Sequence, residues 1–264
     1  MLDLSLLASL PEGHPLRSTW LPRVVDGSAR LAVGHPVNPW VADAHLADLL
    51  LLPHATPEGL ELHAVAGDQM QIQTERSIDA SRRLAQVQWQ PSAATRVSDG
   101  ASGNALWNTA LERGALAVAG QLVGLAQRML DMTVDYAGQR KQFGKPIGAF
   151  QAVKHHLADV FTHIEFAKPV LYRAASALAC GDASLSARVA HAKLACGEAA
   201  LLAARKGIQV HGAMGYTWEV DLQMFMKRAW ALNAAWGDRA FHQERLGQAL
   251  LADAAPLGPG ATFF

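Results

Sequence analysis

The sequence has little cysteine, no excess of either charge and no long hydrophobic run, and each shortage excludes a class of protein. Two cysteines, Cys180 and Cys196, are too few for a disulfide framework and lack metal-type spacing, so we interpret both as small core residues. Lysine plus arginine number 23, as do aspartate plus glutamate, which argues against nucleic acid or an anionic membrane as a partner. Charges interrupt the apolar stretches well short of a membrane span.

A targeting signal is also missing from the first residues. The opening MLDLSLLASLPEGHPLRS lacks a basic start and contains Asp3, so we expect a cytoplasmic protein. Half of the 264 residues are hydrophobic, which is enough apolar surface for one large or two modest globular domains.

The first hundred residues alternate short β-like runs with Pro, Gly, Asp and His, as in a small antiparallel sheet or barrel. We expect strands at 29–33, 46–52, 60–65, 70–74 and 84–89. The stretch 91–104, rich in Ser, Ala and Gly, is interpreted as a linker.

From about residue 105 apolar positions recur every three to four residues. This pattern predicts four helices: 105–139, 150–180 with a kink at Pro169, about 184–210 with Ser184 as a cap after Gly181, and 220–251. Short connections between long helices favour an antiparallel bundle. The predicted fold class is α+β, with a truncated β-domain and short N-terminal segment over 1–103, the bundle over 104–253 and a tail over 254–264.

The first segment with chemical content reads QRKQFGKPIGAFQAVK and covers residues 139–154. Arg140 and Lys141 close one helix, a Gly/Pro loop follows, and the next helix begins near Gln151. Backbone donors beside fixed cations at a helix N-terminus suit a pyrophosphate, and Phe143 can pack on a flat ring. Helix capping by the two cations followed by an ordinary turn explains the same residues.

The second segment, GIQVHGAMGYTWE, covers residues 207–219. Gly212 and Gly215 end the third helix and allow a backbone or a ligand to approach closely. Gln209 in its last turn can donate to an anion or a carbonyl. A helix stop followed by a turn is the alternative here.

Together, RKQFGKPIGAFQAVKHHLAD and IQVHGAMGYTWEVDLQMFMKRA resemble the two signatures of the acyl-CoA dehydrogenase family, in order and separation, over roughly residues 105–250. RSIDASRRLAQVQWQP resembles the end of that family's middle β-domain. The resemblance implies FAD as cofactor and an acyl-CoA thioester as substrate. In the family a base removes the α-proton, the flavin accepts the β-hydride, and hydrogen bonds to the thioester carbonyl raise the acidity of the α-carbon.

The resemblance also assigns cofactor-binding residues. By position it implies that Arg140 contacts the FAD pyrophosphate with Gln142 and Phe143 alongside, and that Gln151 lies near the adenosine end. The residues that would line the dinucleotide are Gln209, Val210, Gly212 and Ala213. In the family these residues serve FAD held mainly by a neighbouring subunit, so an oligomer is implied.

The sequence departs from the family pattern in three ways. The N-terminal helical domain is largely absent, and nothing matches the family's Glu-Pro-Gly-(small)-Gly-Ser-Asp loop or Trp-(Ile/Val)-(Ser/Thr) strand. Trp236 stands at the usual position of the catalytic Glu, and an indole nitrogen accepts no proton at neutral pH. Asp238 lies two residues further along the chain. A helix turns about 200° over two residues, so the Asp238 side chain should face away from the usual base position unless the helix is interrupted. Glu112 falls about two residues from the alternative base position of some members.

We therefore expect an oxidoreductase subunit of a heteromeric acyl-CoA dehydrogenase that contributes FAD contacts to a partner subunit carrying the base. In lacking the standard Glu, the sequence is similar to the family members that work in mixed pairs in steroid side-chain degradation, a branch of lipid metabolism. Electron-transfer flavoprotein is a further candidate partner. We expect no nucleic acid, membrane or metal, because the histidines at 155, 156 and 163 lack ligand spacing.

Two alternatives stay open at this point. One is a self-sufficient short homodimer that uses Glu112 or Asp238 as the base. The other is a non-catalytic assembly subunit that binds no flavin.

Overall fold

The computed structural model describes residues 2–251, with the side chains of residues 2–4 left aside, so the tail expected at 254–264 lies outside the described residues. Contacts divide the chain into two compact units between Gly114 and Ala115. The division falls inside one long helix, α3, which runs from Gly100 to Gln139. Among the described residues no helix is long and apolar enough to cross a membrane.

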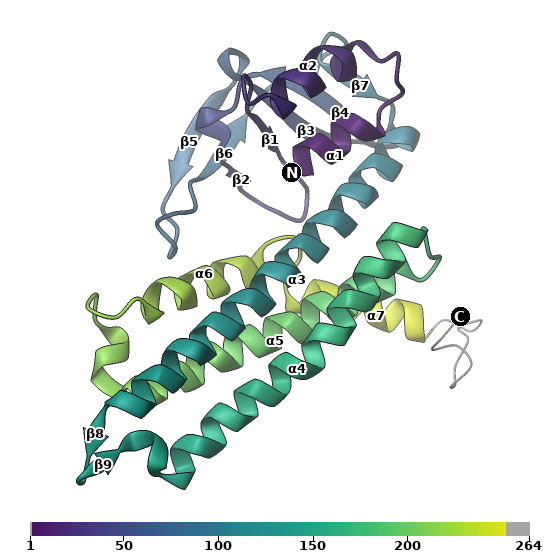
Figure 1. The fold of residues 1–264 in the computed structure, drawn as a ribbon. Helices are drawn as coiled ribbons and strands as arrows, with labels where there is room; N and C mark the ends of the chain where they lie inside the picture. Colours follow the sequence, from purple (N-terminus) through teal and green to yellow (C-terminus); the bar gives the residue numbers. More distant parts are fainter. Residues whose placement is uncertain (1, 252–264) are drawn as a thin grey trace. The chain divides into compact units, whose positions relative to one another are not determined.

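The first unit contains two short helices, two sheets and the first part of α3 (Figure 1). Its helices are α1 (Leu2–Ser9) and α2 (Pro15–Val25). Its strands are β1 (Leu31–Val33), β2 (Val41–Ala42), β3 (Leu49–Thr56), β4 (Gly59–Ala66), β5 (Gln71–Glu75), β6 (Leu84–Gln88) and β7 (Arg96–Ser98). One sheet has the order β1-β3-β4-β7 and the other the order β2-β6-β5.

The five expected strands correspond to β1, β3, β4, β5 and β6, whereas β2 and β7 were not expected. All pairings are antiparallel except that of β1 with β3, which is parallel. The four leucines that open β3, residues 49–52, are all buried, as in a strand covered on both faces. Leu50 and Leu52 belong to a core cluster completed by Ala32, Val41, Ala44, Val65 and Ala85.

The interpretation of residues 91–104 as a linker is wrong. This stretch contains β7 and the first turn of α3, which begins at Gly100. A Cβ atom on Gly100 would lie 2.8 Å from the carbonyl oxygen of Glu58, and one on Gly103 would overlap the carbonyl of Leu60. The glycines in this stretch therefore allow a helix to pack directly against β4, which composition alone does not distinguish from flexibility.

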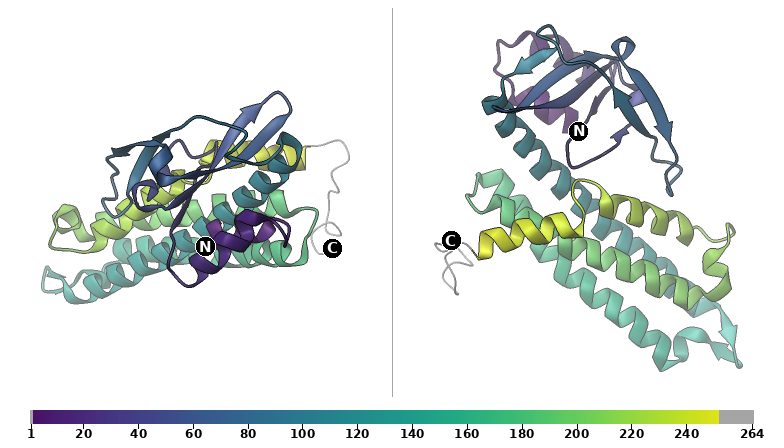
Figure 2. Two further views of the ribbon diagram at one scale, coloured as in Figure 1. Left: turned by 90° about the horizontal axis from the view of Figure 1, so that it is seen from above. Right: turned by 180° about the vertical axis from the view of Figure 1, so that it is seen from behind.

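The second unit is a helical bundle (Figures 1 and 2). After α3 come the hairpin strands β8 (Lys141–Gln142) and β9 (Lys145–Pro146), then α4 (Gln151–Cys180), α5 (Leu185–His211), α6 (Leu222–Ala234) and α7 (Arg239–Leu250). Helix α4 continues through Pro169 without a break. It ends at Gly181, which has a left-handed φ of 66°. Ser184 precedes α5, but its side chain makes no capping hydrogen bond.

Helix α5 is the central helix of the bundle and packs against α4, α6 and α7. Its buried positions are mostly small: Ala190, Ala192, Gly197, Ala199, Ala200, Ala203, Ala204 and Gly207. Small side chains let neighbouring helices approach closely, as the composition of this segment indicates. Cys196 is buried here as expected, but Cys180 is exposed at the end of α4, so its assignment to the core is wrong.

The single helix expected over 220–251 is interrupted. It divides into α6 and α7, with residues 235–238 between them. Trp236 has φ 56° and Gly237 has φ 91°, values that no right-handed helix accommodates. The Asp238 carboxylate accepts a hydrogen bond from the backbone N–H of Phe241 and starts the new helix.

Candidate functional site

The hairpin between α3 and α4 carries the first segment singled out in the sequence. Lys141 pairs with Pro146 and Gln142 with Lys145, so Phe143 and Gly144 form a two-residue turn. Both turn residues have positive φ, 51° and 77°. This matches a type I′ turn, whose twist suits a tight hairpin.

The side chains of this hairpin are largely exposed, although the Phe143 ring meets the Phe150 ring edge-on, with centroids 6.1 Å apart. Phe143 is 92% exposed, the highest value among the large exposed hydrophobic residues. Arg140, Gln142 and Gln151 are also exposed, and Phe150, the N-cap residue of α4, makes no side-chain capping hydrogen bond. Arg140 therefore does not serve as a buried cap of its own helix, and its guanidinium is open to a ligand or a partner chain.

The second segment lies at the same end of the bundle (Figure 1). Helix α5 ends at His211 and is followed by the short 3-10 helix η4, Gly212–Tyr216. The ring of His211 stacks on that of Tyr136 near the end of α3, with ring centroids 4.2 Å apart. The Tyr136 hydroxyl donates to the His211 carbonyl at 3.4 Å, and the Arg140 backbone N–H donates to the Tyr136 carbonyl at 2.8 Å.

His211 is a packing residue at this junction. It is 4% exposed, its Nδ1 hydrogen-bonds to the Gly207 carbonyl at 2.8 Å, and burial lowers the pKa of its imidazole. Of the neighbouring residues, Gln209, Gly212 and Ala213 are exposed, whereas Val210 is buried. The stacked rings of Tyr136 and His211 thus join two segments that lie some seventy residues apart in the sequence. The exposed residues Gln209, Gly212 and Ala213 form a surface beside the hairpin.

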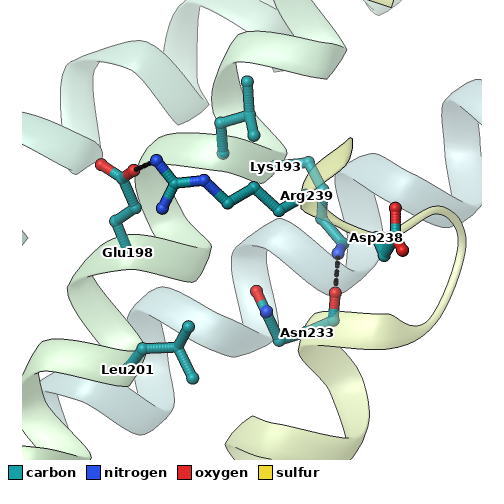
Figure 3. Close-up of a pocket in the computed structure, with 7 residues that line it drawn as sticks. Lys193, Glu198, Leu201, Asn233, Asp238 and Arg239 are labelled. Atoms are coloured by element: carbon teal, nitrogen blue, oxygen red, sulfur yellow. Dashed lines mark hydrogen bonds and ion pairs between the residues drawn. The ribbon is translucent and has the colours of Figure 1, made fainter. Parts of the chain in front are cut away.

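Side chains from two helices hold the loop between α6 and α7, and Figure 3 shows one of them, Lys193. Lys193 on α5 is 3% exposed, and its ammonium donates to the carbonyls of Asn233 at 2.8 Å and Gly237 at 3.0 Å. His242 on α7 is fully buried, and its Nε2 donates to the Trp236 carbonyl at 2.8 Å. Three carbonyls at and after the end of α6 are therefore satisfied by fixed donors.

Burial changes the proton affinity of both donors. It lowers the pKa of Lys193 to about 8, with the nearby Asp238 opposing the shift. It lowers the pKa of His242 to about 4, and the Lys193 and Arg245 cations act in the same direction. His242 is thus neutral at pH 7, with its proton on Nε2.

The two candidate bases occupy different environments. Asp238 is exposed, and its carboxylate is engaged as the cap of α7. Glu112 is 8% exposed and lies on the part of α3 that belongs to the first unit. Trp236, at the position of the family's usual Glu, is 9% exposed in the fixed α6–α7 loop. The sequence did not reveal Lys193 or His242, and the Trp-Gly pair at 236–237 was the one available sign of a helix break.

Comparison with known proteins identifies the family. The acyl-CoA dehydrogenase C-terminal domain matches residues 101–251, more than half of the chain. The chain belongs to the acyl-CoA dehydrogenase family. That family consists of flavoproteins. In this structure the first signature falls on the hairpin and the start of α4, and the second begins at the end of α5 and continues through η4.

Among curated relatives, the acyl-CoA dehydrogenase IpdE2 of Mycobacterium tuberculosis is 39% identical over 153 residues, covering 58% of this chain and 43% of its own. IpdE2 of Mycolicibacterium smegmatis is 36% identical, covering 61% and 47%. The chain therefore spans less than half the length of these relatives.

Solved structures show the same fold. Butyryl-CoA dehydrogenase of Megasphaera elsdenii superposes with a TM-score of 0.84 at 20% identity, covering 95% of this chain and 75% of that one. The FAD complex of PigA superposes with a TM-score of 0.85 at 18% identity, covering 94% and 74%. The expected combination of a helical bundle with a partial β-domain is confirmed.

Proposed function

We propose that this chain is a subunit of an FAD-dependent acyl-CoA dehydrogenase and that it supplies part of the FAD site to a partner subunit. The observation that carries the proposal is the exposed hairpin at one end of the bundle. There an exposed guanidinium and a 92% exposed aromatic ring, which meets the Phe150 ring edge-on, lie next to the end of α5. Such a surface is costly to leave in water and is typical of a site completed by another chain.

The residues present fit the diphosphate and ring portions of a flavin dinucleotide. Arg140 can form charge-assisted hydrogen bonds to phosphate oxygens, and the ring of Phe143 can lie on a flat ring system. Gln142 and Gln151 offer amide donors and acceptors nearby, and Gln209, Val210, Gly212 and Ala213 form the neighbouring surface. When bound, FAD supplies the hydride acceptor of the dehydrogenation.

The proposal places the base on the partner. Trp236 provides no proton acceptor, and the bonds from Lys193 and His242 hold its loop in place. Asp238 caps α7, and Glu112 is buried. Neither carboxylate is presented as an open general base, which disfavours the self-sufficient homodimer.

The substrate class is an acyl-CoA thioester, for which we propose the bulky acyl groups of steroid side-chain degradation. Support comes from the usual base position, where this sequence has Trp236 in place of Glu. The standard Glu is also lacking in the family members that work in mixed pairs in steroid side-chain degradation. The similarity to the two IpdE2 proteins, which are acyl-CoA dehydrogenases of mycobacteria, is consistent with this proposal. A separate electron-transfer flavoprotein would serve as electron acceptor.

Co-expression tests this function. The chain is purified alone and with candidate dehydrogenase-like subunits from the same genome, and flavin absorbance and acyl-CoA-dependent dye reduction are measured. We expect both signals only in a mixed complex. Full activity of the lone chain would refute the partner assignment, and a colourless complex would favour an assembly subunit.

Substitution of Arg140 tests the cofactor contact within that complex. Because charge-assisted hydrogen bonds contribute about 1.5–3 kcal/mol, Arg140→Ala should weaken FAD retention at least about tenfold. Arg76→Ala, at an exposed arginine of the first unit, is the matched control and should retain flavin. Equal flavin content in both variants would contradict the assigned role of Arg140.

A further inference from the structure

Three polar side chains of the first unit are joined by consecutive hydrogen bonds. His63 on β4 is 1% exposed. Its Nε2 lies 3.0 Å from the carboxylate of Glu61 on the same strand, and its Nδ1 lies 2.9 Å from Oγ1 of Thr95, just before β7. The pairing of β4 with β7 brings the three together (Figure 1). A hydroxyl, an imidazole and a carboxylate in this order can act as nucleophile, base and orienting group.

Glu61 determines which ring nitrogen of His63 carries the proton. The hydrogen bond from His63, together with the Arg96 cation at 3.3 Å, lowers the pKa of the Glu61 carboxyl, which is therefore ionised at neutral pH and only accepts. In the neutral imidazole the proton thus lies on Nε2, and the lone pair of Nδ1 faces Oγ1 of Thr95. This is the tautomer that can take a proton from the hydroxyl.

The Thr95 hydroxyl is also part of a turn with Ser92. Its Oγ1 accepts a hydrogen bond from the Ser92 backbone N–H at 3.2 Å and lies 3.1 Å from the Ser92 carbonyl, to which it can donate. Rotation of the hydroxyl hydrogen is enough to move that bond to the nearer Nδ1 of His63. The Ser92 N–H would then stabilise the negative charge that forms on Oγ1 as its proton leaves.

Thr95 and Ser92 line an open groove of about 920 Å³ within the first unit. Trp89 lines the same groove and contacts the His63 ring, with centroids 5.0 Å apart, so the buried imidazole lies directly behind the groove wall. Among the described residues that line the groove, Asp68 alone is charged, and four are glutamines. The apolar lining is completed by Val65, Met70 and Val87. Apolar surface with amide groups and without a cation suits an uncharged ligand better than a phosphate-bearing one.

We propose that Thr95, His63 and Glu61 form a hydrolytic site for small uncharged carboxylic esters that bind in this groove. Oγ1 of Thr95 attacks the ester carbonyl carbon while its proton passes to Nδ1 of His63. The imidazolium gives this proton to the leaving alcohol as the C–O bond breaks, and the acyl group stays on Thr95. Water then attacks the acyl-Thr95 ester with His63 again as base, which releases the acid and restores the hydroxyl.

The net reaction converts ester and water into acid and alcohol, with no change of oxidation state. Thr95 and His63 are the catalytic residues, and Glu61 is a positioning residue that acts through His63. All three belong to the first unit, so the site is independent of the proposed flavin contact on the hairpin.

Hydrolysis of p-nitrophenyl butyrate tests the site. The full chain, together with any subunit that it retains, is assayed by the absorbance of p-nitrophenolate. Thr95→Val keeps the shape of the side chain but removes the nucleophile, so it should lower turnover at least about 100-fold. Thr95→Ser keeps a hydroxyl and should retain hydrolysis within about tenfold of the wild type. Thr162→Val is the matched control, because this exposed threonine on α4 only bonds the Ala158 carbonyl of its own helix, and it should keep the wild-type rate.

Wild-type hydrolysis no faster than that of folded Thr95→Val would overturn the proposal, and circular dichroism establishes that the variant is folded. The role of Glu61 has its own readout. Glu61→Gln should lower kcat at least about tenfold with KM nearly unchanged, because the amide no longer holds the proton on Nε2 of His63. An unchanged kcat would show that Glu61 does not position the base.

Covalent labelling locates the nucleophile even if Thr95→Val does not fold. The wild-type chain is treated with a fluorophosphonate, and the labelled peptide is identified by mass spectrometry. We expect the label on Thr95 and its loss in Glu61→Gln. A label on the neighbouring Ser92, or no label in the segment 91–98, would refute Thr95 as the nucleophile.

Discussion

At the scale of single residues, two buried groups with strongly lowered pKa values lie beside the α6–α7 loop. Lys193 is a buried cation that faces backbone carbonyls, and His242 is a buried neutral imidazole. Both donate to the end of α6, where a helix leaves its last carbonyls without partners. The two side chains therefore stabilise a backbone segment, and neither is exposed for chemistry.

His242 makes stability depend on pH in a defined direction. Its pKa is lowered from 6.5 to about 4 by burial, so between these values the unfolded chain binds the extra proton and the folded chain does not. The free energy of unfolding should therefore fall as the pH falls below about 6.5, by on the order of 2 kcal/mol between pH 7 and pH 5. Denaturant unfolding at the two pH values measures this loss.

His242→Gln should remove that part of the pH dependence, because the amide can still donate to the Trp236 carbonyl but does not titrate. His155→Gln, at an exposed position on α4, is the control and should keep the wild-type difference. The same slope in all three proteins would show that His242 is not the titrating group.

At the scale of elements, the sequence predicted the features that repeat and missed those that depend on one close contact. Apolar periodicity identified α3, α4 and α5, and alternating short runs identified five of the strands in the first unit. The break after α6 was missed because Trp236 and Gly237 lie in an otherwise helical pattern, whereas the non-helical path is stabilised by the bonds from Lys193 and His242 and by the Asp238 cap. The start of α3 was missed because Gly100 packs closely on the first unit's sheet.

Gly237 gives an element-level test of that loop. Its φ is 91°, and an added Cβ would lie 2.7 Å from Nε2 of His242 and overlap the ring of Phe241. Gly237→Ala should therefore lower the free energy of unfolding by about 1–3 kcal/mol. Gly247→Ala in α7 is the matched control, because nothing lies within 4 Å of its Cβ position, and it should raise stability by roughly 0.5–1 kcal/mol. Equal effects would contradict a fixed loop.

At the scale of the whole molecule, the hairpin after α3 presents Arg140 and Phe143 for the proposed FAD contact. Motif order in the sequence was enough to single out this segment. The buried side of α4 could not be recognised in the same way, since Phe166 and Ile164 are equally apolar in the sequence but only Ile164 is buried.

Which subunit carries the base is decided by isosteric substitution in the assembled enzyme. Asp238→Asn keeps a good helix cap, and Glu112→Gln keeps the size of a buried side chain, so neither should disturb the fold greatly. If the partner supplies the base, each variant should retain flavin and turn over acyl-CoA within about twofold of the wild type. A general base contributes about 10²–10⁴-fold to rate, so a loss of this size with flavin still bound would place the base on this chain. The outcome thus separates a subunit that completes a cofactor site from one that performs proton transfer itself.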